Sequence, residues 1–336
     1  MRQILAVISL LALAVPALAN DTTAELGTGG LIFTRSDSIA MESEDLFISQ
    51  EEMRVAYKFR NTSEADVDSL VAFPMPDIES SPYQNVSIPD MASDNFLDFS
   101  VTVDGAKIEP KLDQRAFAAE VDVSDELKAS GISLFPYDEK TDAAIAAMSE
   151  QKRNDWIARG MIVIETYDIG DGGGMKDHYT PTWTLKSTYW WRMSFPKGKL
   201  LDVRHTYKPS VGGTAGLNFV SDGKIGGEML DQYRSTYCMD KAFENAVQKA
   251  VTATGEDGTP YIENWISYIL TTGGNWRTNI GKFKLTIDKG KPENLVSFCG
   301  ENVRKTGPTT YEMTAEDFYP QDDLSILILT KPSDDE

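Results

Sequence analysis

Alternation of apolar and polar residues with a period of two is the feature of this sequence that most restricts its fold. Val55, Tyr57 and Phe59 alternate with smaller or polar neighbours, and the same pattern recurs at residues 201–207 and 283–287. Successive side chains of a β-strand point to opposite faces, so this pattern is typical of a strand with one buried face. Because turn residues separate such segments at short intervals, we predict antiparallel, sandwich-like sheets.

Helical patterns are confined to two parts of the chain. Residues 124–160 contain helix-favouring segments, among them one that Ser149 can cap and that Gly160 can terminate, so we predict a helical insertion there. A further helix is predicted near residues 240–251, where Asp240 can cap and apolar residues recur four apart. The predicted fold class is therefore mainly β, with antiparallel β-sandwich-like sheets, a helical insertion and one further helix in the C-terminal part.

Glycine density indicates a division of the chain. Glycines gather between residues 212 and 227 more densely than elsewhere, and glycine-rich segments commonly separate domains. We therefore predict an N-terminal β domain over residues 20–212, which includes the helical insertion at 124–160. A C-terminal β-rich domain is predicted over residues 213–336.

Residues 1–19 have the pattern of an export signal. Arg2 supplies a positive charge, residues 4–15 are almost continuously apolar, and residues 17–19 end in the small–x–small pattern that signal peptidase recognises. We predict cleavage between Ala19 and Asn20. The apolar run is too short to span a hydrocarbon core of about 30 Å. No later segment is long and apolar enough to span, so an exported protein without a transmembrane segment is predicted.

Cys238 and Cys299 are the two cysteines of the chain. In an oxidising compartment two such thiols are most simply explained as one disulfide. A reactive cysteine is the alternative, but neither residue has a histidine beside it in the sequence, and the spacing is not that of a metal pair. We therefore predict a disulfide that stabilises the C-terminal part.

Charge and motif content exclude several classes of function. The chain has 32 Lys and Arg against 52 Asp and Glu, a net charge of −20, whereas binding to a phosphate backbone needs clustered cations. Nucleic acid is thus excluded as a partner. We find no catalytic signature, and the two histidines, His178 and His205, fit a loop and a strand face. No cofactor is predicted.

An acidic, glycine-rich loop is the one candidate for site chemistry. Asp168, Asp171 and Asp177 flank three consecutive glycines, and carboxylates on a flexible loop can bind calcium. Their spacing departs from the EF-hand pattern. The same carboxylates could instead supply the acid and base of a hydrolase, or the loop could be a solvated hairpin connection.

The chain contains several runs of residues that together are specific enough to compare with known families. They are NDTTAEL at residues 20–26, MESEDLFI at 41–48, FRNTS at 59–63, VAFPMPD at 71–77, RHTYKPSVGG at 204–213, LTTGGNW at 270–276 and DKGKPENLVSFC at 288–299. In these runs the chain resembles an uncharacterised bacterial family, domain-of-unknown-function family 4424. The resemblance spans nearly the whole mature chain and implies a periplasmic protein of a Gram-negative bacterium, with no known activity.

A second resemblance concerns the N-terminal part alone. The pattern F-x-N followed by F-P-x-P, with Val-Asp-Gly at residues 103–105, looks like the sandwich module of vault and inter-alpha-trypsin-inhibitor proteins. That likeness implies an interaction domain.

These observations favour an exported, soluble, non-enzymatic protein that binds another component of the cell envelope. Its partner would be an envelope protein or a cell-wall component. The alternatives are a periplasmic hydrolase that uses carboxylates as acid and base, and a metal-binding structural module.

Overall fold

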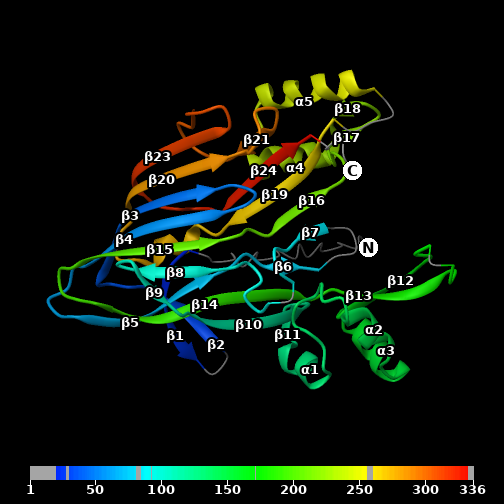
Figure 1. The fold of residues 1–336 in the computed structure, drawn as a ribbon, viewed down its shortest axis with the longest axis horizontal. Coiled ribbons are helices and arrows are strands. Elements are labelled where there is room, and N and C mark those ends of the chain that lie inside the picture. Colours follow the sequence, from blue (N-terminus) through cyan, green and yellow to red (C-terminus); the bar gives the residue numbers. More distant parts are fainter. Residues whose placement is uncertain are drawn as a thin grey trace, which may run out of the picture.

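The computed structural model describes residues 20–331, apart from residues 28–29, 81–84, 92, 171 and 256–259. The predicted signal, residues 1–19 with Ala19, and the candidate residue Asp171 therefore lie outside the described residues. Figure 1 shows strands arranged in two broad layers, with helices beside them at one end. The fold is mainly β and its sheets are largely antiparallel, as predicted.

One layer is a seven-stranded sheet in the order β11-β10-β14-β5-β1-β2, with β6 paired to β14. Its long central strand, β14, contains the aromatic run that includes Trp190 and Trp191, whose side chains lie on opposite faces of the sheet. The strands are β1 (Thr22–Gly27), β2 (Gly30–Thr34), β5 (Val67–Pro74), β6 (Ile78–Glu79), β10 (Lys111–Ala118), β11 (Val121–Asp122) and β14 (Thr184–Phe195).

The other layer is built around an eight-stranded sheet in the order β22-β23-β20-β3-β4-β15-β8-β9. All its strand pairs are antiparallel except β3 with β20, which run parallel. The strands are β3 (Ile39–Ile48), β4 (Met53–Asn61), β8 (Ser100–Val103), β9 (Ala106–Ile108), β15 (Leu200–Tyr207), β20 (Ile280–Asp288), β22 (Arg304–Lys305) and β23 (Thr310–Phe318).

A five-stranded sheet in the order β21-β24-β19-β16-β7 continues this layer. Its strand β24, which lies between β21 and β19, contains residues 326–329, all of them buried, as in a strand covered on both faces. The strands are β7 (Asn85–Ser87), β16 (Val211–Thr214), β19 (Ile262–Tyr268), β21 (Leu295–Phe298) and β24 (Leu324–Thr330).

The remaining elements pack against the sheets or project beside them. Helices α1 (Ser124–Ala129), α2 (Thr141–Ala146) and α3 (Glu150–Ala158) form the predicted insertion, and Ser149 caps α3 by accepting from the backbone N–H of Lys152. The other elements are the hairpin of β12 (Ile162–Tyr167) and β13 (Lys176–Pro181), the hairpin of β17 (Val220–Ser221) and β18 (Lys224–Ile225), helices α4 (Gly227–Tyr237) and α5 (Lys241–Thr254), and the 3₁₀ helix η1 (Thr271–Asn275).

Helix α5 matches the predicted second helix and is capped by Asp240, but α4 was not predicted. The helix begins at Gly227, directly after Gly226, and two consecutive glycines favour a loop. Gly226, at the N-cap position, also has no side chain that could cap the helix. Burial of Leu230 and Tyr233 against β24 and β21 holds α4 in place. Tertiary packing therefore overrides the weak local signal.

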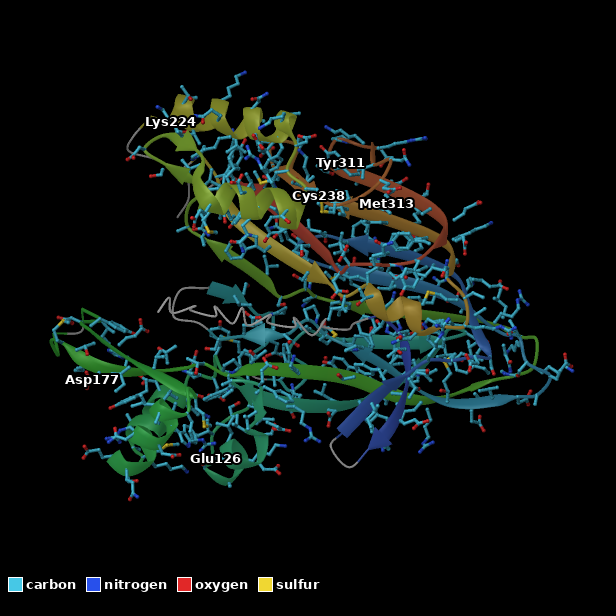
Figure 2. All side chains as sticks on the ribbon, turned by 180° about the vertical axis from the view of Figure 1, so that it is seen from behind. Glu126, Asp177, Lys224, Cys238, Tyr311 and Met313 are labelled. Atoms are coloured by element: carbon cyan, nitrogen blue, oxygen red, sulfur yellow. A yellow bond between two sulfur atoms is a disulfide. The ribbon has the colours of Figure 1, made fainter. Side chains whose placement is uncertain are left out.

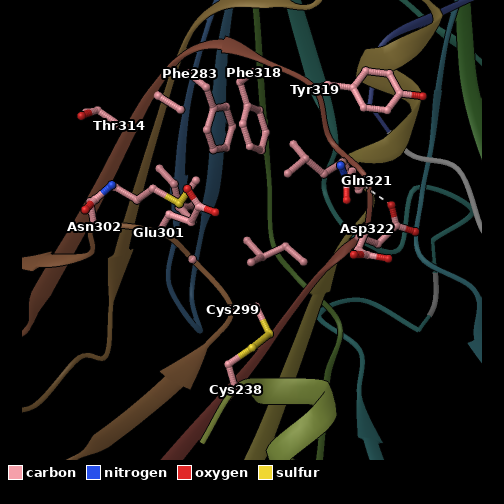
Figure 3. Close-up of a pocket in the computed structure, with 17 residues that line it drawn as sticks. Cys238, Phe283, Cys299, Glu301, Asn302, Thr314, Phe318, Tyr319, Gln321 and Asp322 are labelled. Atoms are coloured by element: carbon pink, nitrogen blue, oxygen red, sulfur yellow. Dashed lines mark hydrogen bonds between the residues drawn. A yellow bond between two sulfur atoms is a disulfide. The ribbon is translucent and has the colours of Figure 1, made fainter. Parts of the chain in front are cut away.

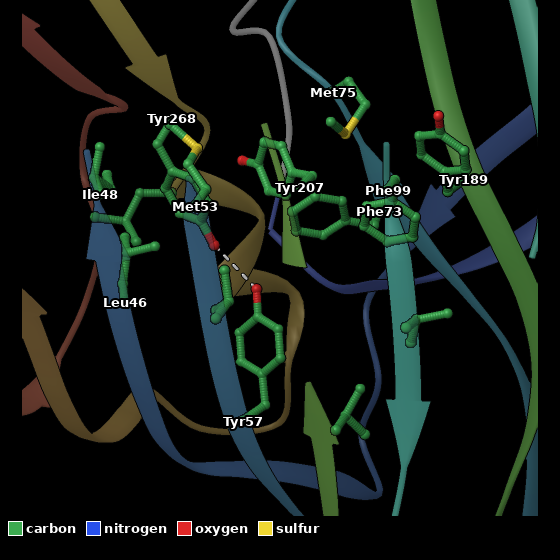
Figure 4. Close-up of a cluster of buried hydrophobic side chains, with 14 of the residues drawn as sticks. Leu46, Ile48, Met53, Tyr57, Phe73, Met75, Phe99, Tyr189, Tyr207 and Tyr268 are labelled. Carbon is green, nitrogen blue, oxygen red and sulfur yellow. Dashed lines mark hydrogen bonds between the residues drawn. The ribbon is translucent and has the colours of Figure 1, made fainter. Parts of the chain in front are cut away.

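The main hydrophobic core lies between the two layers. Figure 4 shows Phe73, of the seven-stranded sheet, near Tyr207 of the eight-stranded sheet and Phe99, the residue before β8. The ring centroids of Phe73 and Tyr207 are 5.8 Å apart, and those of Phe99 and Tyr189 are 4.3 Å apart. The same core includes the alternating residues of β4, β15 and β20, so the period-two pattern at residues 55–59, 201–207 and 283–287 correctly indicated which faces are covered.

The eight-stranded sheet crosses the predicted domain boundary at residue 213. Residues 43–48 of β3 pair with residues 282–287 of β20, and residue 213 itself lies inside β16. The main core likewise combines residues from both sides of the boundary. The two predicted units therefore share a sheet and a core, through a pairing of distant strands that local sequence cannot indicate.

Candidate functional site

A cleft of about 670 Å³ lies where the eight-stranded and five-stranded sheets meet (Figure 3). One wall is apolar and consists of Phe283 and Leu285 from β20 with Met313 and Phe318 from β23. The rings of Phe283 and Phe318 stack, with centroids 4.4 Å apart. The cleft is thus large enough for a small organic group or a few side chains of a peptide.

Strand register explains why these apolar side chains gather. Phe283 is opposite Ala315 and Leu285 is opposite Met313 in the antiparallel pair of β20 and β23. Residues that alternate along each strand share a face, so this register places Phe283, Leu285, Met313 and Ala315 on the side of the sheet that faces the cleft. The sequence pattern at residues 283–287 predicted the buried face but not the cavity beside it.

The mouth of the cleft is polar and acidic. Glu301, Gln321 and Asp322 are exposed there, and no lysine or arginine is among the described residues that line the cleft. Asp323 has a structural role, because its Oδ1 accepts hydrogen bonds from the backbone N–H groups of Leu270 and Thr271 at 3.0 Å. Glu301 and Asp322 therefore supply negative charge beside an apolar wall.

The Cys238–Cys299 disulfide lines another side of the cleft (Figure 3). Cys238 ends α4 in the left-handed region, with φ at 51°, and Cys299 follows β21. The two Cα atoms are 5.0 Å apart, so the bridge ties the end of α4 to the edge of the five-stranded sheet. The predicted pairing is present in the structure.

Such a cleft suits an amphipathic cation. An apolar group can remove the exposed part of the aromatic wall from water, while a positive charge can remain near Glu301 and Asp322 at the wet mouth. An anion would meet only like charge there.

The predicted acidic loop lies away from this cleft. Figure 2 shows Asp177 on the β12–β13 hairpin, at the opposite side of the molecule from Cys238 and Met313. Asp177 Oδ1 accepts from the Thr166 hydroxyl at 2.8 Å, and Asp168 Oδ1 accepts from the Gly170 N–H at 2.8 Å. In the described part of the chain, no group of three or more His, Cys, Asp or Glu side chains is placed to hold a metal ion.

We expect calcium to leave the melting temperature unchanged. The described carboxylates of the loop, Asp168 and Asp177, accept hydrogen bonds within its turn and its hairpin. An occupied site would instead raise stability with the logarithm of the calcium concentration. Thermal unfolding in 2 mM calcium, in roughly the millimolar range of weak extracellular sites, and in a chelator should coincide. A rise with calcium that disappears in Asp168→Asn would restore the metal-binding alternative.

A second polar cluster, fully buried between the layers, was not predicted from the sequence. Asn20, Asp21 and Glu44 are each at most 1% exposed, and His205 Nε2 lies 3.1 Å from Asp21 Oδ2. Burial raises the pKa of Asp21, although the neighbouring His205 opposes this, and burial raises the pKa of Glu44 to about 8. His205 was predicted to lie on a strand face, but its partner, 184 residues away, leaves no local sequence signal.

Comparison with known families identifies the class. The sequence matches the family described as a domain of unknown function, DUF4424, over residues 19–327. The chain therefore belongs to this family, as its sequence runs suggested. The match adds no support for the likeness to vault and inter-alpha-trypsin-inhibitor modules.

The chain was also compared with curated proteins and with solved structures. No curated protein matches the chain. Among solved structures, the chain is similar to a "putative nutrient binding protein" from Legionella pneumophila subsp. pneumophila str. Philadelphia 1, at 14% identity and a TM-score of 0.42, over 93% of this chain and 70% of that one. Among the described residues, no helix has both the length and the apolar character needed to cross a membrane.

Proposed function

We propose that this protein is an exported, periplasmic, non-enzymatic binding protein of the cell envelope. Its ligand carries an apolar group next to a positive charge. The observation that carries the proposal is the cleft between β20, β23 and β24, with its aromatic wall and acidic mouth.

The favoured partner is a segment of another envelope protein. A peptide can place an aromatic or aliphatic side chain against Phe318 and a neighbouring lysine or arginine beside Glu301 or Asp322. Exposed Tyr319 at the rim can add a further ring contact to such a side chain. The net charge of −20 also favours encounter with a basic partner.

Binding of two small probes of matched shape and opposite charge tests the proposal. We expect phenethylammonium to bind and 3-phenylpropanoate not to bind, as measured by calorimetry and by shifts of methyl and aromatic NMR signals at low salt. The NMR shifts should include Met313 and Phe318. Equal binding of both probes, or shifts confined to another part of the molecule, would contradict the proposed cleft chemistry.

Charge-removing variants sharpen this test. Glu301→Gln and Asp322→Asn should each weaken phenethylammonium binding by about 2- to 5-fold, the range for one partly exposed ion pair. Glu51→Gln removes an exposed charge from the β3–β4 turn and serves as the matched control, which should leave affinity unchanged. Ala315→Leu adds a larger side chain to the apolar wall of the cleft and should also weaken phenethylammonium binding, because it occupies the space that the phenyl ring needs.

Native mass spectrometry of protein recovered gently from its own periplasm would show a bound partner directly. Extra mass that is present natively and lost on denaturation supports the binding function and identifies the ligand. Turnover of an ester, peptide or glycoside that vanishes in Asp168→Asn would instead favour the hydrolase alternative. A bare monomer that binds neither probe would contradict the proposal.

A further inference from the structure

The residue predicted to begin the mature chain, Asn20, is held deep inside the protein. It is completely buried, and its backbone N–H donates to the Thr272 hydroxyl of η1. Its side-chain Nδ2 donates to Glu44 Oε2 at 2.9 Å, and the Thr272 hydroxyl donates back to the Asn20 carbonyl at 2.7 Å. Both ends of this one residue are therefore fixed by polar partners from β3 and η1.

The surroundings of Asn20 are acidic and closed to water. Glu44 is 1% exposed and Asp21 is fully buried. Glu44 also accepts from the Tyr268 hydroxyl at 3.2 Å, and the Trp276 indole donates to the Asp21 carbonyl at 2.6 Å. Two buried carboxyl groups share this region with one histidine, His205, and a buried carboxylate without a cation is costly.

We propose that the new α-ammonium group of Asn20, released by signal peptidase, is the missing cation of this cluster. Its nitrogen lies at the Thr272 hydroxyl, in the same residue whose side-chain Nδ2 contacts Glu44. In the cleavage, water adds across the Ala19–Asn20 peptide bond. Its oxygen goes to the new carboxylate of Ala19, and Asn20 keeps the nitrogen as an amine that is protonated at neutral pH. The amino terminus of the mature chain thereby becomes a structural group of the fold.

Burial of Asn20 also sets the order of events. Signal peptidase needs an accessible, extended peptide bond, whereas the backbone nitrogen of Asn20 is bound to Thr272 of η1 and the whole residue is buried in the folded protein. Hydrolysis must therefore precede docking of the segment that leads into β1. Docking then adds the pairing of residues 22–24 with residues 70–72 of β5, which joins β1 and β2 to the seven-stranded sheet.

The pairing has a pH signature. Glu44 has an ordinary pKa of 4.5, which burial raises to about 8, although hydrogen bonds from the Asn20 side-chain amide and the Tyr268 hydroxyl oppose this rise. In that state stability is highest below pH 4.5 and declines as the pH rises toward 8, because the buried group must lose its proton. An adjacent ammonium favours the carboxylate and reduces this decline. The groups that face Glu44 are Asn20 and Asp21 before β1, Tyr57 of β4, Tyr207 of β15 and Tyr268 of β19.

Two chains that differ by one residue test the inference. A self-cleaving N-terminal fusion can release a chain that begins at Asn20 and another that begins at Ala19, with equal net charge. The chain that begins at Asn20 should melt roughly 5 °C or more above the other at pH 7.5, as expected for a correctly placed buried ion pair. The difference should shrink at pH 5, where Glu44 of the longer chain is protonated.

Variants and chemical labelling separate this pairing from a purely steric effect. In Glu44→Gln the difference between the two chains should fall by at least half, whereas Glu42→Gln, on the same strand, should leave it intact. An amine-selective reagent should label the Asn20 α-amine of the native wild-type chain at least about 10-fold more slowly than after unfolding. Equal melting temperatures at pH 7.5, rapid native labelling, or a mature protein that does not begin at Asn20 would each overturn the proposal.

Discussion

Removal of the Cys238–Cys299 disulfide should lower the free energy of unfolding by about 4 kcal/mol. The bridge joins residues separated by 61 positions and therefore restricts a long loop of the unfolded chain. In the native state it ties the end of α4 to the loop after β21, beside the cleft. The double variant Cys238→Ser, Cys299→Ser should show a lower urea midpoint. The secondary structure of its folded state should be unchanged.

The reductant itself provides the control. Dithiothreitol should destabilise the wild-type protein to the level of the double serine variant and should have no effect on that variant. Phenethylammonium binding should weaken in parallel, because both cysteines line the cleft. Two free thiols in unfolded, non-reduced protein, or equal urea midpoints for the two proteins, would show that the bridge does not stabilise the fold.

Replacement of His205 by alanine should destabilise the protein by about 3–5 kcal/mol. His205 and Asp21 have side chains with no solvent exposure, and the change leaves the Asp21 carboxylate without its partner at 3.1 Å. It also opens a cavity among rings, because the imidazole stacks on Phe73 at 4.7 Å and contacts Tyr57 at 5.4 Å. Urea unfolding at neutral pH measures the loss.

His178→Ala is the matched control for this prediction. His178 stacks on Tyr167 at 4.0 Å on the projecting β12–β13 hairpin, so its loss should cost within about 1 kcal/mol. A double-mutant cycle with Asp21→Asn should show that the effects of the His205 and Asp21 changes are not additive. Comparable losses for the two histidines, or full additivity in the cycle, would contradict a coupled buried pair.

Local sequence was informative wherever one property repeats along a strand or a helix. The alternation at residues 201–207 correctly indicated a strand with Leu201, Val203, His205 and Tyr207 buried, because a period of two is a direct consequence of strand geometry. Caps such as Ser149 and Asp240 likewise marked helix starts, since a side chain there satisfies a nearby backbone N–H.

The candidate site was far less predictable. The search for chemistry in the sequence favoured Asp168, Asp171 and Asp177, because carboxylates near glycines form a compact local pattern. The cleft instead combines residues from β20, from β23, from the segment around Asp322 and from the disulfide region. No spacing in the sequence marks such a set, and an acidic residue at its mouth looks like any other of the 52 acids in the chain.

Local sequence therefore indicated the mainly β class, the faces of the principal strands and the family, and it predicts an export signal. Tertiary structure alone decided that β3 runs parallel to β20 across the predicted boundary, and that Asn20 meets Glu44 and Thr272. Periodicity and capping act between residues a few positions apart and leave a local trace. Pairings across about 250 residues, such as Asn20 with Thr272, depend on which buried surfaces and polar groups satisfy one another in the whole fold.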